Sequence, residues 1–368
     1  MAAPADVLIE ALIEEILIRF PPDDPASLVR AALVCKPWCR IVAGAGFRRR
    51  FREFHRTPPV LGLLCNYEDK GFYREAALRF IQFLTASFPH THVRRNRRAI
   101  DARHGRVLLR TMFWDSDDLL PANFVVWNPV SCEEQQLPSL PWYPDRWNAA
   151  VLCAATPSAS CDHLDCSGGP FLVVAVETGA NDVFISVYSS EAGEWSEQSI
   201  QHPGKSDAHW SWPSVLVGTE LCFMLQPRTG ILKYNLRTRE ISVINLPSVQ
   251  YKPDVLTTTD DGRLGFATVH ESRLYLWSRE DGPSDNAGWT ESRVIQLDSL
   301  LPSNALLTSP TAVGFAAGVG IVFMWTDIGV FSIDLKSQRV TKIHKCGGQN
   351  ILPYMNFYTQ VSRYSFSC

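Results

Sequence analysis

The chain has 368 residues, of which 46% are hydrophobic and 20% are charged, a composition typical of soluble globular proteins. Its net charge of −3 conceals a division, because residues 1–110 hold 19 Lys and Arg against 11 Asp and Glu, whereas the remainder holds 16 against 27. A basic front would suit nucleic acid or a membrane surface. We favour the simpler interpretation, in which these charges solvate helices and loops, and expect neither partner.

No targeting or membrane segment is expected. The first residues, MAAPADVLIEALIEE, carry acids where a secretion signal needs a basic region. The most apolar segment, Ala312 to Trp325, has 14 residues and contains three glycines, whereas a membrane-spanning helix needs about 20 residues. The 10 cysteines are scattered and are expected to be reduced, mostly buried thiols. These features predict a protein of the cytoplasm, the nucleus or both.

Three helices are predicted at the front. In the first, apolar residues recur every four positions, at Leu8, Leu12, Ile16 and Phe20 and at Ile9, Ile13 and Leu17. Pro21 and Pro22 end it. Asp24 and Pro25 are a suitable N-cap and first-turn residue for the second helix, and Pro37 marks its end. The third runs from Trp38 to Phe54.

The remaining sequence has all-β character. Apolar runs of five to eight residues recur between Gly, Asn, Asp, Ser and Pro, and helical periodicity is plausible only at residues 72–88. Strand–turn–strand units repeat with corresponding positions at Val126, Val187, Lys233, Leu276 and Ser332. This repeat predicts a β-propeller with five blades at residues 100–140, 149–201, 212–247, 255–298 and 311–345. A sixth would pair residues 60–95 with the tail MNFYTQVSRYSF, so that no sheet edge stays open.

The front resembles a known family. LIEALIEEILIRFPP and DPASLVRAALVCKPWCRIV are similar to the F-box, the three-helix module that docks on the Skp-family adaptor of SCF ubiquitin ligases. Three later segments resemble those of grass-type plant F-box proteins: FRRRFREFHRTPPVLGLL, GWTESRVIQL and PYMNFYTQ. In that family the chain after the F-box is an F-box-associated, propeller-like region. The expected fold is therefore α+β and multidomain: a three-helix F-box at 1–56 (core 6–50), then an all-β propeller of about six blades at 57–368.

The resemblance implies a function and a set of contact residues. The chain would be the non-catalytic substrate receptor of an SCF ligase, joined through the adaptor to cullin and holding an unknown target protein. Carried over by motif, the adaptor-facing residues are Leu8, Ile9, Leu12, Ile16, Leu17, Leu28, Val29, Val34, Cys35 and Trp38. For Ile16, as for Leu33, packing within the three helices is an equal alternative. Ile9 replaces a proline of the family pattern, which would weaken docking.

No catalytic motif is found, and no cofactor is expected. GxSxG, P-loop and HExxH patterns are absent from the sequence. A possible metal site lies within six residues, at Cys161, His163 and Cys166, with Cys153 upstream. Structural zinc sites usually show two separated ligand pairs, however. We therefore favour a loop insertion without metal. Asp260 and Asp261 are interpreted as a turn. The basic run at residues 94–106 is interpreted as a solvated loop leading into a strand.

Aromatic residues in two insertions are candidates for target binding. They are Trp142, Tyr143 and Trp147 in one insertion, and Trp210 and Trp212 in the other. Loops on a propeller rim carry binding, and aromatic anchors dominate interface energies. Packing of these rings between blades is the alternative. The rival function is a propeller-type binding protein, lectin or enzyme whose helical head serves an assembly other than a ligase.

Overall fold

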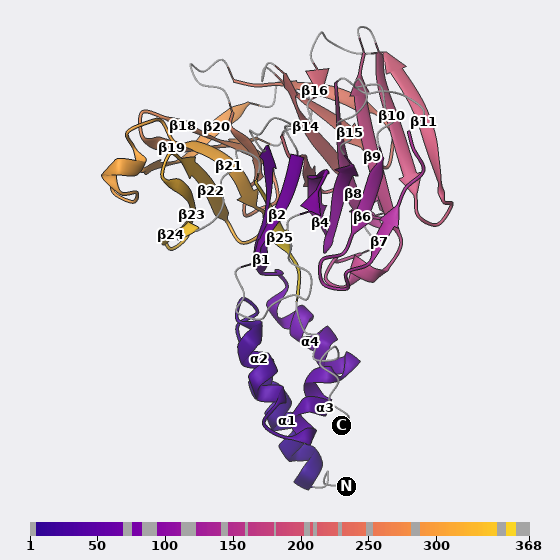
Figure 1. The fold of residues 1–368 in the computed structure, drawn as a ribbon, viewed down its shortest axis with the longest axis vertical. Helices are drawn as coiled ribbons and strands as arrows, with labels where there is room; N and C mark the ends of the chain where they lie inside the picture. The colour runs from indigo at the N-terminus through magenta and orange to yellow at the C-terminus, as the bar shows by residue number, and fades with distance from the viewer. Residues whose placement is uncertain are drawn as a thin grey trace.

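Four helices lie at one end of a six-bladed β-propeller (Figure 1). The computed structural model describes residues 5–68, 76–82, 94–111, 123–140, 146–158, 161–179, 182–201, 207–208, 212–226, 230–247, 253–280, 288–343 and 351–357. The helices, which we call the helical head, are α1 (Ala5–Leu17), α2 (Pro25–Ala32), α3 (Lys36–Ala43) and α4 (Ala45–His55). None of the helices in these ranges is both long and apolar enough to cross a membrane.

The helical head follows the predicted local signals with two departures. The Asp24 side chain accepts the Ser27 N–H and caps α2, as expected. The third predicted helix is instead two helices, because Gly44 adopts extended backbone angles between α3 and α4. Pro37 belongs to the first turn of α3 and does not mark the end of α2. The boundary between head and propeller lies between His55 and Val60.

The first three blades are four-stranded antiparallel sheets. Blade 1 contains β25 (Ile351–Met355), β1 (Val60–Glu68), β2 (Ala76–Gln82) and β3 (Arg94–Arg95). Blade 2 contains β4 (Arg97–Arg103), β5 (Arg106–Thr111), β6 (Phe124–Trp127) and β7 (Glu134–Gln136). Blade 3 contains β8 (Trp147–Cys153), β9 (Phe171–Thr178), β10 (Asp182–Ser189) and β11 (Glu194–Gln201). The loop from β8 to β9 holds two short 3-10 helices, η1 (Thr156–Ser158) and η2 (Cys166–Gly168).

The last three blades are also antiparallel sheets, but blade 4 has five strands instead of four. Blade 4 contains β12 (Asp207–Ala208), β13 (Val215–Val217), β14 (Glu220–Gln226), β15 (Gly230–Asn235) and β16 (Ile241–Asn245). Blade 5 contains β17 (Val255–Thr258), β18 (Leu264–His270), β19 (Arg273–Arg279) and β20 (Trp289–Gln296). Blade 6 contains β21 (Thr311–Ala316), β22 (Ile321–Thr326), β23 (Gly329–Asp334) and β24 (Val340–Ile343), after η3 (Ser303–Ala305). The six-bladed propeller predicted from the repeat is confirmed.

The ring closes in blade 1, where strands from the two ends of the chain pair (Figure 1). β25 pairs antiparallel with β1, with Leu64 opposite Leu352. The closing strand thus precedes the predicted tail, most of which lies outside the described residues. The helix considered for residues 72–88 is wrong for residues 76–82, the part that the structure describes, because these form the strand β2. In β2 the buried side chains of Leu78 and Phe80 flank the exposed Arg79. This alternation suits a sheet packed on one face.

Polar side chains join neighbouring blades near the centre of the ring. Asn66 of blade 1 exchanges two hydrogen bonds with the backbone of Ala99 in blade 2, at 2.8 and 2.9 Å. Asp101 of blade 2 accepts the Val151 N–H of blade 3 at 2.9 Å. Each bond satisfies a backbone group at a blade junction, where the adjoining sheet offers no ladder partner. These junction bonds fix how one sheet sits against the next.

Candidate functional site

Exposed apolar side chains are concentrated on the helical head. Among the described residues, six of the nine large hydrophobic side chains that are exposed belong to it: Ile9, Leu12, Ile16, Leu33, Val34 and Phe54. A monomeric protein rarely leaves such residues grouped in a small module unless the surface binds something. The head therefore carries the strongest candidate for an interaction surface.

The face of α1 shows how this surface is built. Ile9, Leu12 and Ile16 lie three and four residues apart, so they share one side of the helix, and each is more than half exposed. The adjacent side of α1 packs inward through Leu17, which is fully buried. Arg50 of α4 pairs with Glu14 at 3.0 Å and with Glu15, and its hydrogen bond lowers the pKa of Glu15. These ion pairs hold α1 against α4 and leave the apolar side free.

The structure divides the ten predicted adaptor-facing residues. Ile9, Leu12, Ile16, Val34 and Cys35 are exposed, whereas Val29 and Trp38 are half-buried. Leu17 and Leu28 do not lie on the surface, because both side chains are buried in the core of the head with Val42, Phe47 and Phe51. Leu8 lies in α1, and its side chain is outside the described residues. Leu33, the other residue weighed as core packing, is exposed, as Ile16 is.

The position of Ile9 bears on the missing proline. Ile9 is the fifth residue of α1 and lies beyond its first turn. A proline there would remove an intrahelical hydrogen bond and clash with the preceding turn, at a cost of about 3 kcal/mol. In this chain Ile9 thus suits the helix better than the proline of the family pattern.

The predicted aromatic rim receives little support from the residues that are described. Trp147 is 1% exposed and packs in the core between blades 2 and 3, so its assignment to the rim is wrong. Arg110 lies over its ring at 4.8 Å. Trp212 is half-buried against the core of blades 4 and 5, and its carbonyl accepts a hydrogen bond from Asn148. Trp142, Tyr143 and Trp210 lie outside the described residues.

Two other sequence features are structural. The basic run at residues 94–106 is not a solvated loop, because it forms β3, β4 and their turns, with Arg98 and Arg106 buried. Asp260 and Asp261 form a turn, as predicted, and Asp261 pairs with Arg263 at 2.7 Å.

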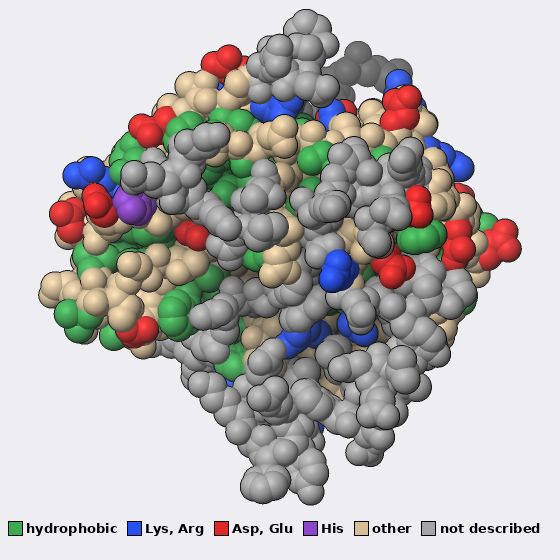
Figure 2. Space-filling view, turned by 90° about the horizontal axis from the view of Figure 1, so that it is seen from above, with side chains coloured by type: hydrophobic (Ala, Val, Ile, Leu, Met, Phe, Trp, Pro, Cys, Tyr) green, Lys and Arg blue, Asp and Glu red, His purple; other side chains and the backbone are tan. Residues whose placement is uncertain are grey.

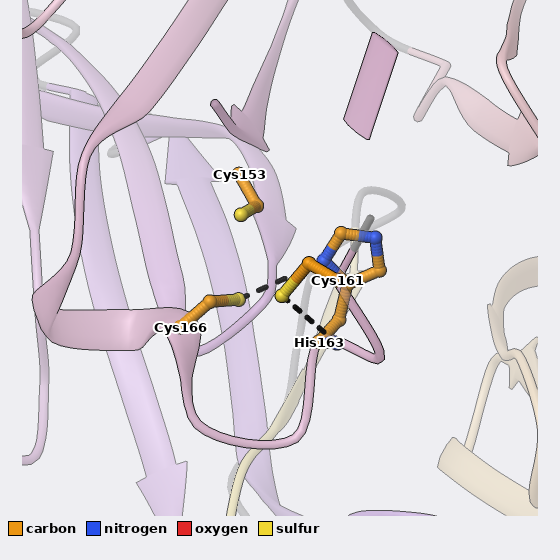
Figure 3. Close-up of side chains that lie close together, drawn as sticks. All are labelled: Cys153, Cys161, His163 and Cys166. Atoms are coloured by element: carbon orange, nitrogen blue, oxygen red, sulfur yellow. Dashed lines mark hydrogen bonds between the residues drawn. The ribbon is translucent and has the colours of Figure 1, made fainter. Parts of the chain in front are cut away.

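The structure gathers the cysteine and histidine residues that the sequence places near one another. Cys153 ends β8, and Cys161, His163 and Cys166 follow in the β8–β9 loop. Their four potential ligand atoms all lie within 4.8 Å of one another, and their side chains point into one common space (Figure 3). All four residues stand out in the sequence, but the sequence does not show that they meet, because the approach of Cys153 to the loop is a tertiary contact. Cys153 alone, from the end of β8, therefore supplies the fourth donor beside the three of the loop, instead of a second ligand pair.

Neighbouring groups set the charge around this cluster. Burial raises the pKa of the Cys166 thiol to about 12, with Cys153 and Cys161 adding to the rise. Burial likewise lowers the pKa of His104 to about 2, so this imidazole is neutral. The three cysteines of the cluster are free of disulfides. Elsewhere Cys65 is disulfide-bonded, which corrects the expectation of uniformly reduced thiols.

The β8–β9 loop also forms part of the joint between the head and the propeller. Leu164 packs against the core of the head, and Asp165 pairs with Arg52 of α4. Phe357, which follows β25, is buried in the same core with its ring edge-on to Phe51 at 6.2 Å. A cavity of 390 Å³ lies beside this joint, lined by the 56–58 linker, the ends of inner strands and His163 and Cys166.

Comparisons with known proteins identify a family and several similar proteins. The F-box protein AT5G49610-like β-propeller family matches residues 98–359. F-box protein At5g03970 of Arabidopsis thaliana is 25% identical over 290 residues, which cover 72% of this chain and 64% of that protein. A solved structure of a functionally unknown Desulfotomaculum acetoxidans protein is 11% identical with a TM-score of 0.47, covering 80% of this chain and 89% of that one. The Cps50 (Swd1) β-propeller domain of Myceliophteria thermophila is 11% identical with a TM-score of 0.41, covering 77% and 82%. Because the family match spans most of the sequence, the chain belongs to the plant F-box proteins with an AT5G49610-like β-propeller.

Proposed function

We propose that this chain is a substrate receptor of an SCF-type ubiquitin ligase, acting in the cytoplasm or the nucleus. Its helical head is an F-box that docks on a Skp-family adaptor and, through it, on cullin. The observation that carries the proposal is the exposed apolar face of α1, formed by Ile9, Leu12 and Ile16. Family membership supplies the class of partner, and this face supplies a surface of matching chemistry.

The size of the exposed surface supports a partner rather than chance exposure. Fully burying a side chain of this kind contributes about 1.5–3 kcal/mol, so covering the exposed halves of three such residues contributes several kcal/mol to binding. The connection between α2 and α3 adds exposed apolar surface through Leu33, Val34 and Cys35. An adaptor with an apolar groove would cover these residues by the helix-in-groove mode of recognition.

The propeller would hold the target protein. Figure 2 shows the face opposite the helical head, where acidic and basic side chains of the described residues are interspersed towards the outer edge. Trp142, Tyr143 and Trp210 remain candidate target contacts. The receptor contributes proximity alone, since it raises the effective concentration of target lysines near the conjugating enzyme and forms no covalent intermediate.

Adaptor binding can be tested with the full chain and a purified plant Skp-family adaptor by calorimetry. The double variant Leu12→Ala and Ile16→Ala should keep its helical circular dichroism and weaken binding by at least about tenfold, as expected for interface anchors. Leu307→Ala is the matched control, because Leu307 is 82% exposed on the propeller. Unchanged affinity in a folded double variant would contradict the docking surface.

The receptor role needs a separate experiment. Proteins that bind the propeller would be captured from plant tissue with the full chain, then incubated with reconstituted adaptor, cullin, RING subunit and ubiquitin-conjugating enzyme. We expect ubiquitination of a captured protein that requires this chain and fails with the α1 double variant. Adaptor binding without ubiquitination of any captured protein would place the chain in an assembly other than a ligase.

A further inference from the structure

The four side chains Cys153, Cys161, His163 and Cys166 have the composition and spacing of a metal site. The Cys166 sulfur lies 3.7 Å from Nδ1 of His163, and all four ligand atoms lie within 4.8 Å of one another (Figure 3). Zinc bound tetrahedrally at about 2.3 Å from sulfur and about 2.0 Å from nitrogen places its ligand atoms roughly 3.5–3.8 Å apart. Side-chain rotations that move the ligand atoms by about 1 Å would therefore close the cluster around an ion.

The charge beside the cluster is an independent indication. Arg106 is 3% exposed, and its Nη2 donates to the carbonyls of Cys166 and Gly169. Its Nη1 is buried without a hydrogen-bond partner, and no carboxylate of the described residues forms an ion pair with it. A buried cation normally has a counter-charge nearby. Three thiolates around Zn²⁺ carry a net charge of −1, which would supply one.

Supporting contacts already hold the donors in place. The backbone N–H of His163 donates to the Cys161 sulfur at 3.3 Å. The ring of His104 stacks on that of His163, with centroids 4.0 Å apart and planes 9° apart, and His104 Nδ1 accepts the Cys153 N–H at 3.1 Å. Outer contacts of this kind orient metal ligands in other proteins. The adjacent 390 Å³ cavity, which His163 and Cys166 help to line, offers a route for the ion.

The position of the site defines its role. Between the ligands, Leu164 packs on the core of the helical head and Asp165 pairs with Arg52. On the other side Ser167 lies against Gly105 of the β4–β5 turn, where a Cβ atom would come within 2.8 Å of the Ser167 Cβ. The loop is thus held between the head and blade 2.

We propose that Cys153, Cys161, His163 and Cys166 bind one structural Zn²⁺, which anchors the 161–168 loop and sets the orientation of the helical head on the propeller. The four protein ligands leave no open position, so the ion is structural and not catalytic. On binding, the three thiols release their protons to solvent and the imidazole coordinates in its neutral form. The site does not depend on adaptor docking and can be tested without a partner.

Zinc binding would be measured on the full chain, purified anaerobically with zinc in the medium and dialysed. We expect one zinc per chain by elemental analysis, and Co²⁺ substitution should give the visible and thiolate charge-transfer bands of tetrahedral coordination. Cys161→Ser and Cys166→Ser should lose the zinc and the bands. Cys132→Ser is the control, because Cys132 is a free, half-buried thiol in blade 2. His104→Ala, which removes a positioning residue, should weaken zinc binding by about 10–100-fold.

The structural consequence would be measured by hydrogen exchange with and without a chelator. Zinc removal should increase exchange in residues 161–168 and in α4, while blade 5 keeps its protection. Three results would overturn the proposal: wild-type chain without stoichiometric zinc or cobalt bands, equal metal in Cys161→Ser and wild type, or a Cys153–Cys166 disulfide in the anaerobic protein. Bound zinc with unchanged exchange in α4 would refute its role at the joint.

Discussion

The Tyr354 hydroxyl is a sharp test of how the ring is closed. Tyr354 lies in β25, is fully buried, and donates to the Gly105 carbonyl of the β4–β5 turn at 3.1 Å. Asn356 Nδ2 donates to the same hydroxyl at 3.2 Å. Burial raises the pKa of Tyr354, which keeps the hydroxyl protonated and able to donate. Its removal in Tyr354→Phe leaves the buried Gly105 carbonyl without this donor.

The expected cost follows from that unpaired group. Leaving a buried acceptor unsatisfied costs about 1–3 kcal/mol, while the ring, which packs edge-on to Phe80 at 5.6 Å, is retained. For a domain of this size each kcal/mol lowers the melting temperature by roughly 2–4 °C, so calorimetry should show a fall of about 2–12 °C.

A second tyrosine provides the control. Tyr234 of β15 is also buried, but its hydroxyl makes no hydrogen bond among the described residues. Tyr234→Phe should therefore change the free energy of unfolding by less than about 0.5 kcal/mol. If the two variants melt alike, the hydroxyl contact of Tyr354 does not stabilise the closure.

Three further variants probe the head and the blades by urea unfolding. Leu28→Ala should destabilise the helical head by about 2–5 kcal/mol, because the side chain is buried in its core; a wild-type midpoint for loss of helical signal would contradict this. Gly62→Ala should lower the free energy of unfolding by about 1–3 kcal/mol, since the added Cβ would lie 2.5 Å from the Ile81 carbonyl oxygen. Gly46→Ala in α4, where no atom lies within 4 Å of the added Cβ, should raise it by about 0.5–1 kcal/mol. Equal effects of the two substitutions would refute this contrast. Burial raises the pKa of the Asp101 carboxyl in the folded protein, despite the nearby Arg103. The carboxyl therefore contributes stability below its unfolded pKa of about 4, and this stability is lost as the pH rises through the folded pKa. Asp101→Asn should gain stability relative to wild type between pH 4 and pH 7, and a difference in unfolding free energy that is constant over this range would count against the raised pKa.

The sequence predicted the blades well because their signal is local and repeated. Each blade is a set of short apolar strands separated by turn residues, and the five predicted blade ranges contain most of the strands of blades 2 to 6. β2 was missed because AALRFIQ is rich in residues that favour helices. Pairing with β1 over seven residues overrides that preference, and pairing between distant segments cannot be read from local propensity.

The site was predicted less completely, for two physical reasons. An amphipathic helix shows which residues are apolar, but not which of two adjacent apolar stripes faces inward, so buried Leu17 was grouped with exposed Ile16. Contacts that form only when the blades assemble into the ring could not be predicted from the sequence either. Trp147 is buried because blade 3 packs on blade 2, and Cys153 meets the 161–166 loop because the β8–β9 connection folds back.

The closure of blade 1 also governs when the protein can finish folding during synthesis. A ribosome adds about 5–20 residues per second, so β1 is made long before β25, its partner at residues 351–355. Until then β1 presents an unpaired edge, which is a template for aggregation. The helical head cannot complete its core before this stage either, because Phe357 is part of that core. A nascent chain shorter than about 357 residues would thus display both an open strand and an incomplete head, which are features that chaperones and proteases bind.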